Sequence, residues 1–209
     1  MSTDVAKYPG LNLGPAHGAD NQKAETKVYG FWVFLMSDLI IFGLMFATYV
    51  TMNNPMSYAG GPEPKDFINL ASAFAQTMLL LFSSLTFGFA GLALVFKQSV
   101  VRANFWLIIT LLLGIGFLTL EMYDFIEMFE MGAEPSRSGY LSAFFGLVPL
   151  HGLHVTAGCI WIVVMLIQLR LFGLTAVTKV RLLCLALFWH FLDIVWIGIF
   201  SVVYLGGVA

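Results

Sequence analysis

Charged residues are scarce in this chain of 209 residues. Only 10 residues are Lys or Arg and 12 are Asp or Glu, so charged residues make up 11% of the sequence. Soluble globular proteins carry about a quarter. Hydrophobic residues reach 59%. The composition therefore excludes an ordinary soluble domain, and the lack of a basic cluster excludes nucleic acid as a partner.

Cysteine is equally rare, with Cys159 and Cys184 as the whole set. Neither belongs to a Cys-x-x-Cys or Cys-x-x-Cys-His spacing. This excludes covalently attached haem c and a binuclear thiolate copper centre, because their ligands are missing. We interpret both cysteines as small apolar packing residues.

Long uncharged runs are what the chain has instead. No charged residue occurs in 67–96, 103–120 or 138–169, and 28–62 and 182–209 hold one each, Asp38 and Asp193. At about 1.5 Å per residue even the shortest run, residues 103–120, would span roughly 27 Å, close to the hydrocarbon thickness of a bilayer. The sequence predicts an all-α membrane protein with five transmembrane helices, at about 28–51, 67–96, 103–124, 138–169 and 181–206.

The basic residues predict how the bundle is oriented. Lys and Arg are retained in cytoplasmic segments, so the side with most of them is the inner one. With the N-terminus inside, eight basic residues are inner (Lys7, Lys23, Lys27, Lys97, Arg102, Arg170, Lys179 and Arg181) and two are outer (Lys65 and Arg137). We expect a cytoplasmic N-terminus, a periplasmic C-terminus, a loosely ordered tail over residues 1–27 and one transmembrane domain over residues 28–209.

Seven histidine or acidic residues fall inside or at the edge of the expected spans. Helical rise places five of them in the middle layer, namely Asp38, His151, His154, His190 and Asp193. Glu121 and Asp124 form an acidic pair one turn apart near the outer boundary. Such groups are costly in hydrocarbon, so we expect the five to face other protein as a buried polar network.

Residue types alone leave three hypotheses for that middle layer. Three imidazoles and a carboxylate are ligands that zinc, iron or copper accept. Histidine and aspartate also carry protons in pumps and transporters. The third hypothesis is a polar core that fixes helix register. A di-iron bundle would need paired Glu-x-x-His motifs, which the sequence lacks.

Six strings along the chain carry a family resemblance. They are FWVFLMSD (31–38), FATY (46–49), TLEMYDF (119–125), RSGYLSAFFGL (137–147), HGLHVTAG (151–158) and WHFLDIVWI (189–197). In this order they resemble subunit III of the haem-copper respiratory oxidases, and most of all the five-helix version in bo-type ubiquinol oxidase. The resemblance runs from about residue 27 to the C-terminus.

The resemblance implies an accessory subunit of a bacterial cytoplasmic-membrane complex that reduces oxygen with electrons from ubiquinol and moves protons outward. Haems and copper would belong to subunit I, which this chain would contact directly, with subunits II and IV completing the complex. The chain itself would have no catalytic residue and no cofactor or metal ligand, and would bind structural phospholipid. Its histidines and aspartates would be structural polar groups.

The resemblance also has departures and an alternative. Asp38 stands where many family members have a membrane-embedded glutamate that reacts with carbodiimide, and many relatives have two further helices that form a lipid cleft. The alternative from another class is a proton-coupled secondary transporter that would use Asp38, His190 and Asp193 as proton carriers. A metal-bearing membrane oxidoreductase is a third hypothesis.

Overall fold

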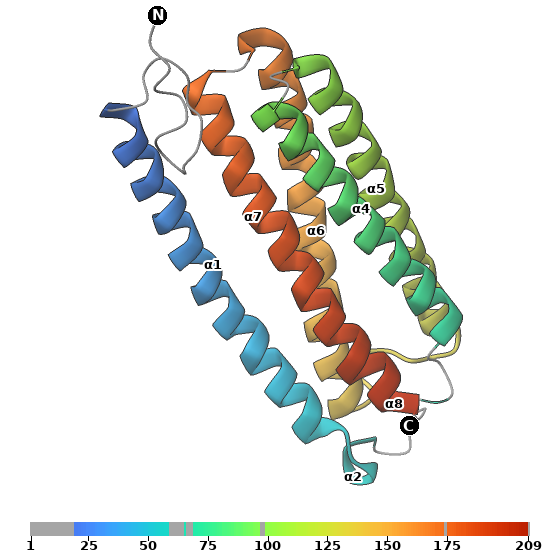
Figure 1. Cartoon of the computed structure of the whole chain (residues 1–209). Helices are drawn as coiled ribbons and strands as arrows, with labels where there is room; N and C mark the ends of the chain where they lie inside the picture. Colours follow the sequence, from blue (N-terminus) through green and yellow to red (C-terminus); the bar gives the residue numbers. More distant parts are fainter. Residues whose placement is uncertain (1–18, 59–64, 66–68, 97–98, 174, 209) are drawn as a thin grey trace, which may run out of the picture.

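A computed structural model describes residues 19–58, 65, 69–96, 99–173 and 175–208 (Figure 1). The long helices are α1 (Ala19–Met52), α4 (Leu70–Phe96), α5 (Val100–Glu130), α6 (Gly139–Phe172) and α7 (Ala176–Ile199). α7 continues as the π-helix η2 (Phe200–Leu205) and the short α8 (Gly206–Val208), and α2 (Pro55–Tyr58) follows α1. Five helical segments are long and apolar enough to cross a membrane, which confirms the predicted all-helical class and five spans.

Four of the five long helices extend past the spans that the charges predict, and α1 and α5 extend furthest. α1 begins at Ala19, inside the segment 1–27 that we assigned to the tail, and residues 1–18 lie outside the described part. α5 continues to Glu130, beyond the expected end at 124. Charged residues mark where the hydrocarbon ends. A helix forms its backbone hydrogen bonds internally, so it can continue beyond that point into the polar boundary of the membrane.

Local sequence signals set the other helix ends. α6 starts where the Ser138 hydroxyl accepts a hydrogen bond from the Leu141 N–H at 3.1 Å, and Thr175 caps α7 in a capping box. Gly132 follows α5 with φ 73° and Gly173 follows α6 with φ 64°. Left-handed residues of this kind end helices, and glycine adopts the conformation without the steric cost of a Cβ.

α7 is the central helix of the bundle. It lies between α1 and α4 in Figure 1 and packs against both, as well as against α6. The spans differ in how much of their most apolar stretch is buried. In the last span, which contains α7, 56% of these residues are buried, whereas in α1 only 22% are. α7 is therefore surrounded by three other long helices, whereas α1 presents one face to the bundle and one outward.

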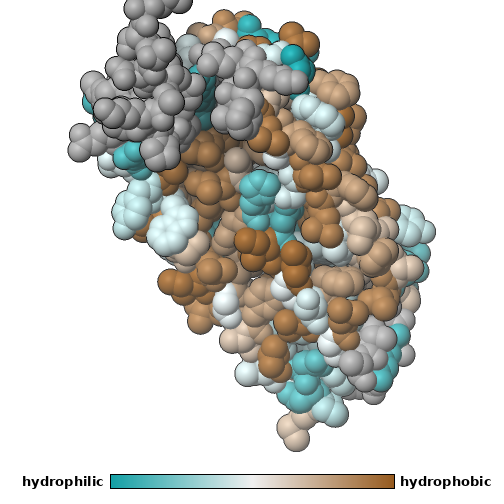
Figure 2. Space-filling model, viewed as in Figure 1, coloured by the Kyte–Doolittle hydropathy of each residue, from teal (hydrophilic) through white to brown (hydrophobic). Residues whose placement is uncertain are grey.

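The outward surface is largely apolar. Figure 2 shows that hydrophobic side chains predominate across the middle of this face, around one hydrophilic group, and that other hydrophilic side chains lie toward both ends. Large apolar side chains of α1 are exposed, including Trp32, Phe34, Ile40 and Leu44, which are 45–65% accessible. A surface like this is stable against lipid chains or partner helices and not against water.

Candidate functional site

Asp38 on α1 meets His154 on α6. Asp38 is 8% exposed, and its Oδ2 lies 3.3 Å from His154 Nε2, an ion-pair distance without hydrogen-bond alignment. The other ring nitrogen, Nδ1, donates to the Leu150 carbonyl at 2.7 Å. Each group thus gives the other a polar neighbour, which lowers the cost of burying both in hydrocarbon.

His190 and Asp193 on α7 form a second group with α4. His190 Nδ1 is 2.6 Å from the Ser84 hydroxyl and 4.0 Å from Asp193 Oδ2. Asp193 is 7% exposed, and neither of its carboxyl oxygens is hydrogen-bonded within the described part of the chain. The His190 side chain is 45% exposed, so this group reaches the surface of the bundle.

His151 is separate from both groups. It is fully buried, and neither ring nitrogen has a hydrogen-bond partner among the described residues. Its ring packs against Phe42, Phe117 and Trp196, with 5.3 Å between the His151 and Trp196 ring centroids. His151 therefore acts as one flat ring in an aromatic cluster.

The five middle-layer residues thus lie in three places: Asp38 with His154, His190 with Asp193, and His151 among aromatic rings. Among the residues that the structure describes, no three His, Cys, Asp or Glu side chains are grouped closely enough to hold a metal ion. The metal centre that we considered from the sequence therefore has no assembled ligand set there. The transporter hypothesis needs Asp38 to work with His190 and Asp193, but Asp38 pairs with His154 and His190 with Ser84.

The two acidic residues near the outer boundary also contact different helices. Asp124 accepts hydrogen bonds from Ser72 at 2.8 Å and from Gln76 at 2.6 Å, which joins α5 to α4. Glu121 is 3% exposed, and its carboxyl lies against Gly152 of α6, where an added Cβ would come within 2.5 Å of Oε2. The absence of a side chain at Gly152 makes room for this carboxyl.

Two indole–hydroxyl hydrogen bonds join α7 to α4, and the sequence analysis did not foresee them. Trp189 Nε1 donates to the Ser83 hydroxyl and Trp196 Nε1 to the Thr77 hydroxyl, each at 3.0 Å. A buried indole N–H needs an acceptor, and hydroxyl groups are the nearest ones that apolar helices offer. The sequence does contain a signal for these bonds: WHFLDIVWI has two tryptophans that need acceptors, and α4 has Ser and Thr residues that can supply them.

Trp189 also fills a slot between α5 and α6. A Cβ at Gly114 would come within 2.9 Å of Trp189 Cη2, and one at Gly158 within 2.9 Å of Cζ3. Trp189 itself is 1% exposed. The two glycines therefore allow α5 and α6 to close on the six-membered ring of the indole.

Two tyrosines connect three helices at the end of the bundle where α1 ends and α6 begins. The hydroxyl groups of Tyr49 on α1 and Tyr140 on α6 are 2.8 Å apart, and Tyr49 donates to the Val203 carbonyl of η2 at 3.4 Å. Since Tyr49 uses its proton on that carbonyl, Tyr140 donates to Tyr49. The polar contacts described so far mostly join side chains of different helices.

Comparison with known proteins gives a consistent result over nearly the whole chain. The model of the family "Cytochrome c oxidase subunit III" matches residues 13–208. Cytochrome bo(3) ubiquinol oxidase subunit 3 of Pseudomonas putida is 47% identical, over 90% of this chain and 89% of the relative. The Pseudomonas aeruginosa protein of the same name is 44% identical over 93% and 92%. Quinol oxidase subunit 3 of Bacillus subtilis is 40% identical over 91% and 96%.

Proposed function

This chain belongs to the cytochrome c oxidase subunit III family, and on that premise we propose that it is subunit 3 of a bo3-type ubiquinol oxidase. The complex would oxidise ubiquinol, reduce oxygen to water and move protons outward across a bacterial cytoplasmic membrane. The observation that supports this most directly is that the family model covers all five transmembrane helices, while subunits of bo(3) ubiquinol oxidases are similar over 90% or more of the chain.

Within the complex the chain is an accessory subunit that stabilises subunit I. Several of its polar side chains are paired between its own helices, as in Asp38 with His154 and Trp189 with Ser83. Its outward apolar surface, in contrast, is available for a partner helix or lipid. We therefore assign haem and copper to subunit I, contact with subunit I to this surface, and membership in the same complex to subunits II and IV.

The positions of the basic residues at the helix ends support the proposed orientation in the membrane. Six described basic residues sit at one end of the bundle, where α1, α5 and α7 begin and α6 ends (Lys23, Lys27, Arg102, Arg170, Lys179 and Arg181). The other end carries Lys65 and Arg137. By the positive-inside tendency the first end faces the cytoplasm, so the N-terminus is inside and the C-terminus is periplasmic.

The chain also carries bound phospholipid, which fills apolar surface between it and its neighbours. Removal of the subunit would then expose a lipid-covered flank of subunit I. The expected consequence is loss of durable turnover, with the redox centres left in place.

Metal analysis and optical spectra of the purified complex, before and after gentle removal of this subunit, test the proposal. We expect haem and copper to stay with the remaining subunits, and oxygen consumption to decline faster over many turnovers. A wild-type chain that never co-purifies with a haem-containing subunit would overturn the assignment. Iron or copper that travels with the released chain would overturn its accessory role.

A further inference from the structure

His190 is a polar side chain that opens onto the membrane-facing surface at mid-depth. It stands at the middle of the span Ala176–Leu205, about 21 Å along the helix from Ala176. Its side chain is nevertheless 45% exposed. Figure 2 shows one hydrophilic group in the middle of a face that is otherwise largely hydrophobic. Ionisable residues at this depth almost always face protein or a water-filled cavity, so an imidazole edge open to hydrocarbon needs a further partner.

Contacts within the chain satisfy only one edge of the His190 ring. Its Nδ1 is 2.6 Å from the Ser84 hydroxyl of α4, whereas Nε2 has no hydrogen bond to any residue that the structure describes. Asp193, whose Oδ2 lies 4.0 Å from Nδ1, is 7% exposed, and its two carboxyl oxygens likewise have no hydrogen bond in the described ranges. This polar group is therefore incomplete within the subunit, and unmet polar groups are costly in hydrocarbon.

The surface beside His190 allows another helix to come close. Gly88 lies one turn from Ser84 on α4 and Gly91 one turn further, and a Cβ at either glycine would meet nothing within 4 Å. One turn beyond His190 on α7, Ile194 is 67% exposed. Small residues next to a polar side chain are typical of interfaces between transmembrane helices, because they let the backbones approach. We call the five residues the His190 face (Ser84, Gly88, Gly91, His190 and Ile194).

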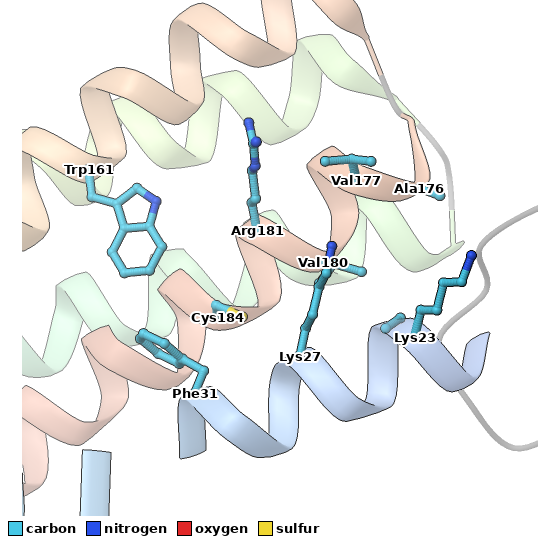
Figure 3. A pocket seen from close by; sticks show the side chains of 10 residues that line it. Lys23, Lys27, Phe31, Trp161, Ala176, Val177, Val180, Arg181 and Cys184 are labelled. Atoms are coloured by element: carbon cyan, nitrogen blue, oxygen red, sulfur yellow. The ribbon is translucent and has the colours of Figure 1, made fainter. Parts of the chain in front are cut away.

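The His190 face is separate from the largest enclosed space near α7. Figure 3 shows that space, a cavity of about 390 Å³ between α1, α6 and α7, which Cys184 of α7 lines. At 3.6 residues per turn, Cys184 lies about 120° around the helix from His190. The two features therefore use different sides of α7.

We propose that the His190 face binds a transmembrane helix of another subunit, which presents a hydroxyl or amide side chain to His190 Nε2 at the middle of the membrane. The proposal rests on the proposed function, because the oxidase complex supplies the partner helix. Hydroxyl and amide groups offer both a donor and an acceptor, so they match either tautomer of His190.

A helix fits this position better than a lipid does. Headgroups lie at the boundary of the hydrocarbon, about 15 Å from its middle, and the acyl chains between them have no hydrogen-bonding group. A helix satisfies its own backbone in hydrocarbon and can carry one polar side chain to mid-depth. The partner is therefore identified by the depth of its polar residue.

Photocrosslinking in the purified oxidase complex tests where the partner lies. The probe is p-benzoylphenylalanine in place of Ile194, in the middle of the exposed part of α7. We expect a crosslink to the middle of a transmembrane helix of another subunit, with a Ser, Thr, Tyr, Asn or Gln within one turn of the crosslinked residue. Crosslinks to lipid alone, or to a helix without such a residue, would overturn the inference.

A bulk variant tests the close approach. Gly88→Leu adds a side chain where nothing in the described chain lies within 4 Å, so it should remove the Ile194 crosslink without disturbing the packing of the subunit itself. Gly43→Leu on α1 is the matched control, since Gly43 is equally open, and it should leave the crosslink unchanged. Equal crosslinking by the two variants would overturn the inference.

A second pair of variants tests the hydrogen bond. His190→Phe keeps a ring and loses the polar edge, whereas His190→Gln keeps a donor and an acceptor. We expect the Phe variant to dissociate from the complex about threefold more readily, which corresponds to the average of about 0.6 kcal/mol for an interhelical hydrogen bond in a membrane. Equal dissociation would overturn the inference. If the wild-type chain still co-purifies with a haem-containing subunit, the proposed function stands in every one of these cases.

Discussion

The slot around Trp189 makes a quantitative prediction about helix packing. Replacement of Gly114 by Ala would put a methyl group 2.9 Å from Trp189 Cη2 and 3.1 Å from Cys159 Sγ. The indole cannot shift freely, because it is 1% exposed and its Nε1 donates to Ser83. Gly116, two residues along the same helix, is the matched control, since a Cβ there would meet Leu79 at an ordinary 3.6 Å.

The magnitude follows from the difference between these two sites. Both substitutions gain the same helix preference of Ala over Gly, up to about 1 kcal/mol, so that effect cancels in the comparison. Overpacking at a tight site costs about 1–3 kcal/mol. If the indole moves, the loss of an interhelical hydrogen bond in a membrane adds about 0.6 kcal/mol. We expect Gly114→Ala to be less stable than Gly116→Ala by about 1–3 kcal/mol.

Thermal release of this subunit from the purified complex measures the difference. For a domain of this size the predicted penalty lowers the transition midpoint by roughly 2–12 °C. The fraction of the chain that stays with the complex after each heating step gives that midpoint. Equal midpoints for the two variants would show that α5 and α6 tolerate a methyl group at the slot, and would refute the packing argument.

Three further predictions concern the polar groups and the orientation. Asp38→Leu should reduce the assembled subunit more than Asp38→Asn on quantitative immunoblots, because Leu offers the partly buried His154 no polar partner; equal loss would contradict the pair. Gly152→Ala should lower the thermal midpoint by displacing the Glu121 carboxyl, and Glu121→Ala in the same chain should restore part of the loss; purely additive effects would argue against the contact. A cysteine at Ser57 should react with an impermeant maleimide in intact cells, whereas one in the N-terminal tail should react only after lysis; the reverse pattern would invert the topology.

Sequence reasoning foresaw the class and the number of spans because both depend on transfer of residues into hydrocarbon. A charge is expensive there wherever it lies, so the uncharged runs identify the membrane segments without any knowledge of neighbours. The same argument singled out Asp38 and Asp193 as exceptions that need protein partners. It was less accurate for helix ends such as Ala19 and Glu130, since a helix can continue beyond the hydrocarbon.

Only the tertiary structure decided which partner each polar residue meets. His151 and His154 are three residues apart on one helix, yet His151 lies among aromatic rings and His154 faces Asp38. Likewise the sequence contains Trp189 and the small residue Gly158 without any sign that they touch. Helical spacing and the cost of burial are properties of single segments, whereas these contacts depend on which helix faces meet, and that is determined by how all five helices pack together.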